Sequence, residues 1–428
     1  MSVTNEKLVI RRAAALPRGV GLMNPVFAAK ALNSLVWDVE GTRYIDFAAG
    51  IAVVNTGHRH PKIVEAIQTQ LNAFTHTCHH VLPYENYVAL AERLNKLVPG
   101  EFEKKTCFVT TGAEAVENAV KIARAATNRT AIIGFSGGFH GRTFMGMSLT
   151  GKVSPYKAGF GAMMPDTFHI PFPIKERGIS VEDTLSAIAT LFKTTVEPQR
   201  VAAFIIEPIQ GEGGFYIAPE ALMAGLRNIC DQYGILLIAD EVQSGFARTG
   251  RHFAMEHFSV VADITCMAKG LAGGMPLAAV TGRADVMDAA APGGLGGTYG
   301  GNPLSVASAN AVLDVIDEEK LCARAEILGS TLIKRLGEIQ ETTPEMTDIR
   351  GVGFMVAAEF RDSDGGPGAK FAARVKLEAL KRNLILLTCG IDGNVIRFLA
   401  PITIEQDIFD EAMNILDQAI AAARSDLK

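Results

Sequence analysis

The stretch DITCMAKGLAGGMPLAAVTG, from Asp263 to Gly282, contains one lysine, Lys269, in a run of small and apolar residues. The pattern predicts a buried strand, a glycine-rich turn and a second buried strand, with Lys269 at the end of the first. An ammonium group is costly to remove from water, so this lysine has two interpretations. Either it reaches solvent at the strand end, or burial lowers the pKa of its amine and makes it a nucleophile.

Six short and almost entirely apolar runs lie between residues 105 and 282, and helical segments separate them. They read TCFVT, AIIGF, VAAFIIEPI, GILLIADEV, ADITCMA and LAAVTG. Continuous rather than alternating hydrophobicity indicates strands that are buried on both faces, which is typical of a parallel sheet covered by helices. The sequence therefore predicts an α/β fold with a central, mostly parallel sheet.

Both ends of the chain have a different pattern. Near the N-terminus, LVWDVEGTRYIDF alternates around Glu40 and Gly41 and predicts a hairpin. The C-terminal part mixes strand-like segments such as GVGFMVAAEF and NVIRFLAP with the amphipathic segment AKFAARVKLEALKR. We expect a large domain over residues 61–325 and a smaller α+β domain formed by residues 1–60 and 326–428.

Composition and charge exclude several classes of protein. The 428 residues are 48% hydrophobic and 20% charged, as in a well-packed globular enzyme. A formal net charge of −5 gives no general attraction to nucleic acid or to anionic membranes. No apolar run reaches the roughly 18 residues that a membrane span needs, and the N-terminus has no signal-peptide core. We expect a cytoplasmic protein.

The cysteines and histidines give no sign of a metal site. The six cysteines are scattered and form no CxxC pair, which is typical of reduced thiols rather than disulfides or zinc ligands. Three histidines surround Cys78 in THTCHH, but no acidic or cysteine partner lies at ligand spacing. We expect no bound metal.

Polar residues follow the predicted strands at their carboxyl ends, where open α/β sheets bind ligands. After TCFVT, a predicted helix begins at Gly112 and Ala113, so free backbone N–H groups there could hold an anion. After AIIGF, the loop SGGFHGRT offers Phe139 or His140 as a face that stacks on a flat heterocycle. Each feature also suits an ordinary turn, and the chain has neither a P-loop nor a convincing GxGxxG.

The run GILLIADEVQSG ends in Asp240 and Glu241 after six residues without a polar side chain. A carboxylate there is either a helix cap or ion-pair partner, or it holds the protonated nitrogen of a pyridine ring. Lys269 follows at the end of the next predicted strand. An anion-binding helix start, a stacking residue, an acid and a lysine at successive strand ends describe a pyridoxal 5′-phosphate (PLP) site. This favours the nucleophilic interpretation of Lys269.

Several motifs resemble those of the class III (ω-amino acid) aminotransferases of PLP fold type I. They are TTGAEAVENAVKIARAAT, FHGRT, IIEPIQGEGGF, LIADEVQSGFARTG, MAKGLAGGMPLA and GGTYGGNP, and the resemblance extends from about residue 5 to the C-terminus. It is greatest to the members that act on 4-aminobutyrate. The resemblance implies PLP as cofactor and transfer of the amino group of 4-aminobutyrate to 2-oxoglutarate, giving succinate semialdehyde and glutamate. The alternative donor is 5-aminovalerate or another ω-amino acid.

The resemblance also implies roles at the cofactor. Lys269 would bind PLP covalently and move the proton during transfer, and Asp240 would pair with the ring nitrogen. Phe139 would stack on the ring, and Gln243 would lie near its phenolic oxygen. The other cofactor-binding residues that the resemblance implies are Gly112, Ala113, His140, Glu207, Val242 and, from a second subunit, Thr298. We therefore expect a homodimer or tetramer with shared active sites.

Four residues match the family's substrate positions: Ile51, Arg142, Glu212 and Arg397. Arg142 would hold the distal carboxylate of the donor, while Glu212 pairs with Arg397. When 2-oxoglutarate enters, Glu212 would move away and Arg397 would bind the α-carboxylate, which suits a bidentate guanidinium. Ile51 replaces the tyrosine of relatives that act on ornithine, which favours a slim, uncharged chain. From its sequence context alone, Arg397 equally suits an interior salt bridge.

Two residues depart from the family pattern. Ala113 stands where serine is usual, which removes a hydroxyl donor but leaves the backbone N–H groups, so we expect weaker phosphate binding. Gly270 follows the lysine where serine is common, and the sequence offers no explanation. The competing functions are an aminomutase and a non-catalytic PLP-binding protein. The intact Lys269 and Asp240, together with both substrate arginines, argue against the second of these.

Overall fold

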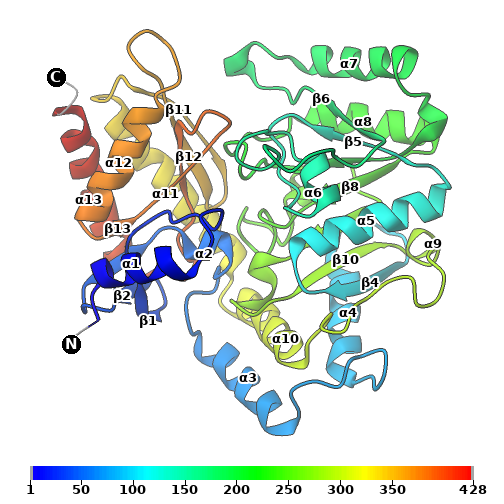
Figure 1. Ribbon diagram of the computed structural model, residues 1–428, viewed down its shortest axis with the longest axis horizontal. Coiled ribbons are helices and arrows are strands. Elements are labelled where there is room, and N and C mark those ends of the chain that lie inside the picture. The colour runs from blue at the N-terminus through cyan, green and yellow to red at the C-terminus, as the bar shows by residue number, and fades with distance from the viewer. Residues whose placement is uncertain (1–2, 426–428) are drawn as a thin grey trace.

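The computed structural model describes residues 3–425. The chain forms one seven-stranded sheet and two four-stranded sheets. Figure 1 shows the seven-stranded sheet with its helices on one side of the molecule and the two smaller sheets on the other, together with both termini. No helix within residues 3–425 is long and apolar enough to cross a membrane.

The large sheet has the strand order β4-β10-β9-β8-β7-β5-β6. Its strands are β4 (Lys104–Val109), β5 (Ala131–Phe135), β6 (Thr167–Ile170), β7 (Val201–Ile206), β8 (Leu236–Asp240), β9 (Ile264–Met267) and β10 (Ala278–Arg283). Neighbours are parallel except at β10, which is antiparallel to both β4 and β9. The predicted α/β fold with a mostly parallel sheet is confirmed. The antiparallel direction of β10 and the edge strand β6 were not predicted.

Helices cover both faces of this sheet. On one face, α5 (Gly112–Thr127) buries Val116, Ala119, Val120 and Ala123 against the strands. On the other face lie α7 (Val181–Thr194) and α8 (Glu220–Tyr233). The remaining helices of this part are α3 (Pro61–Ala73), α4 (Glu85–Leu97), α6 (Phe144–Leu149), α9 (Ala284–Met287) and α10 (Pro303–Glu318).

The two smaller sheets join the ends of the chain. One consists of β1 (Ala28–Leu32), β2 (Leu35–Asp38), β3 (Arg43–Asp46) and β13 (Leu384–Ile385), and the other of β11 (Met346–Val352), β12 (Met355–Phe360), β15 (Val395–Phe398) and β14 (Leu387–Cys389). Strands β2 and β3 form the predicted hairpin, and β13 adds to β3 in parallel. The helices of this part are α1 (Asn5–Ala15), α2 (Ala49–Ala52), α11 (Leu321–Gln340), α12 (Ala369–Lys381) and α13 (Gln406–Ser425). The domain boundaries near residues 60 and 325 stay a prediction.

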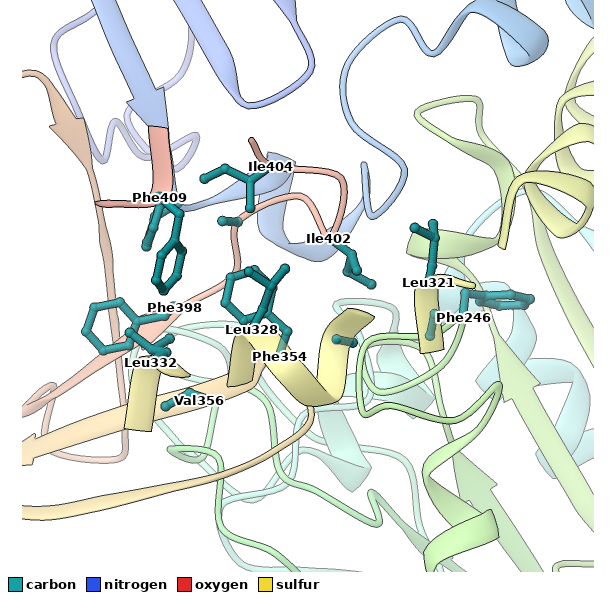
Figure 2. Packing of buried hydrophobic residues seen from close by; sticks show 14 of the residues in the cluster. Phe246, Leu321, Leu328, Leu332, Phe354, Val356, Phe398, Ile402, Ile404 and Phe409 are labelled. Carbon is teal, nitrogen blue, oxygen red and sulfur yellow. The ribbon is translucent and has the colours of Figure 1, made fainter. Parts of the chain in front are cut away.

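One hydrophobic cluster runs between the two parts of the molecule. Leu321 and Leu328 of α11 belong to it, together with Phe354 from the turn between β11 and β12, Phe398 of β15 and Phe246 from the segment after β8. Figure 2 shows these side chains along α11, with Phe246 beside Leu321 at one end and Phe398 at the other. Burial of these apolar side chains stabilises the contact between the two parts. The cluster thereby fixes β15 relative to the large sheet.

Candidate active site

A cavity of about 560 Å³ lies where the strands of the large sheet end. Segments that follow β4, β5, β7, β8 and β9 form its walls, as expected for an open α/β sheet. The sequence-predicted residues that line it are Gly112, Ala113, Phe139, His140, Arg142, Glu207, Glu212, Asp240, Val242, Gln243 and Lys269. Ile51, Thr298 and Arg397 lie outside this lining.

The start of α5 presents free backbone donors to the cavity. Thr111 caps the helix, because its hydroxyl accepts from Glu114 N at 3.2 Å. The Glu114 carboxylate accepts in turn from the amides of Thr110 and Thr111, at 2.8 and 2.9 Å. Within residues 3–425, no protein group accepts a hydrogen bond from the Gly112 or Ala113 amide. These two amides, at the positive end of the helix dipole, suit a phosphate.

Asp240 ends β8 as a buried carboxylate whose orientation is fixed. Its Oδ2 lies 2.7 Å from His140 Nδ1, and its Oδ1 accepts from Val242 N at 3.1 Å. Burial lowers the pKa of His140, but the hydrogen bond and charge of Asp240, with the charge of Glu207, raise it more, so that the net shift is upward. Because an ionised carboxylate only accepts, His140 Nδ1 donates to Asp240. The sequence had offered His140 as a stacking face and gave no sign of this pairing.

Glu207 ties together two loops of the cavity. It follows β7 and is buried, and its two oxygens accept from Phe139 N at 2.8 Å and from Gly211 N at 3.0 Å. Burial raises the pKa of Glu207 to about 7. The first of these bonds fixes the backbone of Phe139, which lines the cavity, and the second fixes Gly211 in the neighbouring loop.

Lys269 follows β9 and begins the short 3₁₀ helix Lys269–Ala272 with a φ of +43°. A lysine in the left-handed region is strained, and such strain gathers at functional sites. Burial lowers the pKa of the Lys269 amine; the charge of Glu212 opposes this effect and that of Arg397 adds to it. The amine is thus neutral more often than an exposed lysine, as a nucleophile requires.

Gly270 leaves room for a neighbouring side chain. A Cβ at this position would lie 2.5 Å from Asn55 Nδ2, and that nitrogen donates to Phe246 O at 2.8 Å. Asn55 Oδ1 also accepts from the buried Arg248 guanidinium at 2.6 Å. Glycine therefore follows the lysine here because Asn55 occupies the space that a serine side chain would need.

Just outside the cavity lining, Arg397 of β15 is buried and its Nη1 donates to Glu212, which does line the cavity. Burial raises the pKa of Glu212, but the charge and hydrogen bond of Arg397 lower it more, so the carboxylate is ionised. Because Glu212 lines the cavity together with Lys269, this ion pair belongs to the site rather than to the interior of the C-terminal sheet.

Arg142 is exposed and also lines the cavity, with its guanidinium carbon 5.0 Å from the centroid of the Tyr156 ring. The same ring lies 4.9 Å from that of Phe139. Sequence reasoning missed Tyr156, because no motif marks it and the fold of the loop after α6 decides its position. Burial first, and then the charge of Glu212, raise the pKa of Tyr156 to about 12.

Two predicted residues lie apart from these groups. Ile51, in α2, is partly buried and has a φ of +67°, an uncommon value for a β-branched residue, while Val53 from the same turn lines the cavity. Thr298 is exposed between α9 and α10, and its predicted role concerns a second subunit. Among residues 3–425, no group of three or more His, Cys, Asp or Glu side chains could hold a metal ion.

The residues present fit PLP. Gln243 Oε1 is buried in the cavity lining with no hydrogen-bond partner among the described residues, and the Gly112 and Ala113 amides are free. A phosphate would accept from the two amides, and a phenolic hydroxyl would donate to the Gln243 oxygen. A nucleophilic lysine, an oriented acid and a free helix start around one cavity of this sheet define a PLP-dependent enzyme of fold type I.

The chain belongs to the class III aminotransferases, whose family model matches residues 16–420. It is 54% identical over 422 residues to a 5-aminovalerate aminotransferase of Pseudomonas putida, covering 98% of this chain and 99% of that one. It is 52% identical over 423 residues to a 4-aminobutyrate aminotransferase of Escherichia coli, with the same coverage. The ornithine aminotransferase structure from Toxoplasma gondii matches at 30% identity with a TM-score of 0.87, covering 99% of this chain and 96% of that one. The protein is therefore a PLP-dependent aminotransferase.

Proposed function

We propose that this enzyme transfers the amino group of 4-aminobutyrate to 2-oxoglutarate, giving succinate semialdehyde and glutamate. The observation that carries the proposal is the buried ion pair between Glu212 and Arg397, whose glutamate lines the same cavity as Lys269 and the exposed Arg142. We also propose a cytoplasmic homodimer or tetramer in which Thr298 contributes to the active site of a second subunit.

The ion pair explains how one site accepts two kinds of substrate. The donor has only a distal carboxylate, which Arg142 binds, while Glu212 keeps Arg397 neutralised. 2-Oxoglutarate brings a second carboxylate, which replaces Glu212 on Arg397. The buried guanidinium then has a carboxylate partner in both half-reactions, which matters because an unpaired buried charge is strongly destabilising.

The other residues serve the cofactor. When bound, PLP supplies an electron sink that allows a C–H bond next to the amine to lose its proton. Lys269 would hold PLP covalently, and its amine would accept and return the proton of the substrate carbon next to the amine. Asp240, oriented by His140 and the Val242 amide, keeps the ring nitrogen protonated.

At the edge of the cofactor, Gly112 and Ala113 donate their amides to the phosphate. Phe139, held through its backbone by Glu207, stacks on the ring, and Gln243 lies near the phenolic oxygen. Ile51 would narrow the site for the donor chain from the turn whose Val53 lines the cavity.

5-Aminovalerate is the second candidate donor, because the relative that is 54% identical to this chain is named a 5-aminovalerate aminotransferase. It differs from 4-aminobutyrate by one methylene, which a pocket distinguishes by about 10- to 200-fold. Measuring kcat/KM for unbranched ω-amino acids of three to six carbons tests the choice. We expect 4-aminobutyrate to give the highest value, and a higher value for 5-aminovalerate would replace it as the substrate.

Glu212→Gln tests the ion pair itself. It leaves Arg397 without a carboxylate in the donor half-reaction, at a cost of several kcal/mol. We expect the half-reaction with 4-aminobutyrate to slow markedly and that with glutamate to hold, as measured by single-turnover changes in the visible absorbance of the cofactor. Glu326→Gln, which breaks an exposed pair with Arg251, is the matched control and should change neither. Equal losses in both half-reactions of Glu212→Gln would contradict the proposal.

A further inference from the structure

Glu212 lies near the tip of a short loop, residues 209–217, here called the Glu212 hairpin. Ile209 and Ile217 form an isolated antiparallel bridge at its base, and Gln210 N donates to Tyr216 O at 2.9 Å. The backbone oxygen of Glu212 accepts from Gly390 N at 3.0 Å. The hairpin is therefore attached to the C-terminal sheet at the very residue whose side chain pairs with Arg397.

Arg350 of β11 holds the same hairpin from another direction. Its Nε donates to Gly214 O at 2.8 Å, and its guanidinium carbon lies 3.8 Å from the centroid of the Tyr216 ring. Its Nη1 donates to Glu359 at 2.8 Å and also to Asp348. One arginine thus contacts the hairpin through a backbone carbonyl and an aromatic face, while two carboxylates fix its own position.

Glu359 of β12 extends this network to the strand that carries Arg397. Its carboxylate is 2% exposed and accepts from Tyr216 Oη at 2.7 Å and from Asn394 Nδ2 at 3.2 Å. Asn394 directly precedes β15, in which Arg397 pairs in register with Ala357 of β12. A single buried network therefore fixes the backbone on both sides of the Glu212–Arg397 pair.

We propose that Arg350 is a positioning residue that sets the geometry of the Glu212–Arg397 pair. It fixes the backbone of the Glu212 hairpin, so that the pair opens by rotation of the Glu212 side chain alone. Arg350 does not line the cavity, so it acts through the hairpin rather than on the substrate. The inference rests on the proposed function, in which the pair is closed for the donor and open for the acceptor.

Arg350→Met tests this role, because it keeps an unbranched stem but removes the charge and all donors. We expect it to slow the half-reaction with 4-aminobutyrate relative to that with glutamate by about tenfold, which is the effect of losing the one charge-assisted hydrogen bond that Arg350 donates to the hairpin. Arg350→Lys keeps the charge and should restore part of the ratio between the rates of the two half-reactions. Tyr216→Phe removes only the hydroxyl that binds Glu359, and should shift the ratio in the same direction but less.

Arg324→Met is the matched control. This arginine of α11 also donates to backbone carbonyls, those of Ile402 and Ile404, but not to the hairpin. It should lower the melting temperature without changing the ratio of the half-reactions. If Arg350→Met does not fold, Arg350→Lys and Tyr216→Phe decide the question.

The outcomes separate this inference from the proposed function. If the ratio of the two half-reaction rates shifts in Glu212→Gln and also in the Arg350 variants, the proposed function and the positioning role of Arg350 are both supported. A shift in Glu212→Gln alone, with equal losses in the Arg350 variants, overturns the positioning role and leaves the proposed function standing. An unchanged ratio in Glu212→Gln overturns the alternation of the ion pair, and the role of Arg350 falls with it.

Discussion

Replacing Gly112 by alanine should weaken PLP binding, because the missing side chain lets the start of α5 approach the cofactor closely. A Cβ at this position would lie 2.9 and 3.1 Å from the two methyl groups of Val242, and 3.5 Å from Ala268 Cβ. Both neighbours line the cavity. The added methyl group must therefore displace either Val242 into the ligand space or the first turn of α5 away from it.

The size of the effect follows from these contacts. Optimal carbon–carbon separations are about 3.5–4.0 Å, so two of the three contacts are clearly too short. Overpacking of this kind costs about 1–3 kcal/mol, and bound PLP would prevent Val242 from relaxing into the cavity. A loss of about 1–2 kcal/mol corresponds to a roughly 5- to 30-fold weaker affinity for PLP.

Titration of the cofactor-free protein with PLP, followed by visible absorbance, measures this change. Pyridoxal, which lacks the phosphate, is the matched ligand and should lose much less affinity on the same substitution. Gly225→Ala is the matched protein control, since its Cβ would lie 3.0 Å from Leu185 in another part of the core and should affect stability alone. Unchanged PLP affinity in Gly112→Ala, or an equal loss for pyridoxal, would refute the reasoning.

Two further predictions concern the cofactor site. Lys269→Ala should remove the absorbance band of covalently held cofactor and abolish turnover, and an active variant with an unchanged spectrum would contradict the role of Lys269. Because the pKa of His140 is raised in the folded protein, its pairing with Asp240 contributes stability that is fully present below its ordinary pKa of 6.5 and is lost as the pH rises through the raised value. Thermal melts of the cofactor-free protein should therefore show that His140→Asn lowers the melting temperature more at about pH 6 than at about pH 9. Equal losses of melting temperature at the two pH values would contradict a stabilising pairing of His140 with Asp240.

The large sheet could be predicted because its strands are buried on both faces and so are apolar without interruption. Burial on both faces does not indicate the direction of a strand. Strand β10 lies between β4 and β9, and its residues would be buried whether it ran parallel or antiparallel to them. Strand β6 escaped prediction because it lies at the sheet edge, where His169 is exposed and the apolar pattern breaks.

The site could be predicted where it depends on strand ends, and not where it depends on packing between distant segments. Asp240 and Lys269 follow adjacent parallel strands, so their meeting at one edge follows from topology. Glu212 and Arg397 meet only because the hairpin and β15 pack together, which no local pattern encodes; the family resemblance supplied that pair. Nothing in the sequence indicated Tyr156 or the contact of Asn55 with Gly270.

The ion pair also bears on the nucleophile, because both of its members act on Lys269. Burial lowers the pKa of Lys269, the charge of Glu212 raises it and that of Arg397 lowers it, so the two paired charges act on the amine in opposite directions. In the proposed function, the α-carboxylate of 2-oxoglutarate replaces Glu212 on Arg397 with a group of the same charge. A carboxylate therefore faces the guanidinium in both half-reactions, and Arg397 never becomes a lone buried cation beside the amine. A neutral residue in place of Glu212 would leave Arg397 unopposed in the donor half-reaction. That would disfavour the charged form of Lys269 in one half of the cycle only. In the proposed function, exchange of one carboxylate for another would thus let the site change substrates while a negative charge continues to face Arg397 beside the lysine.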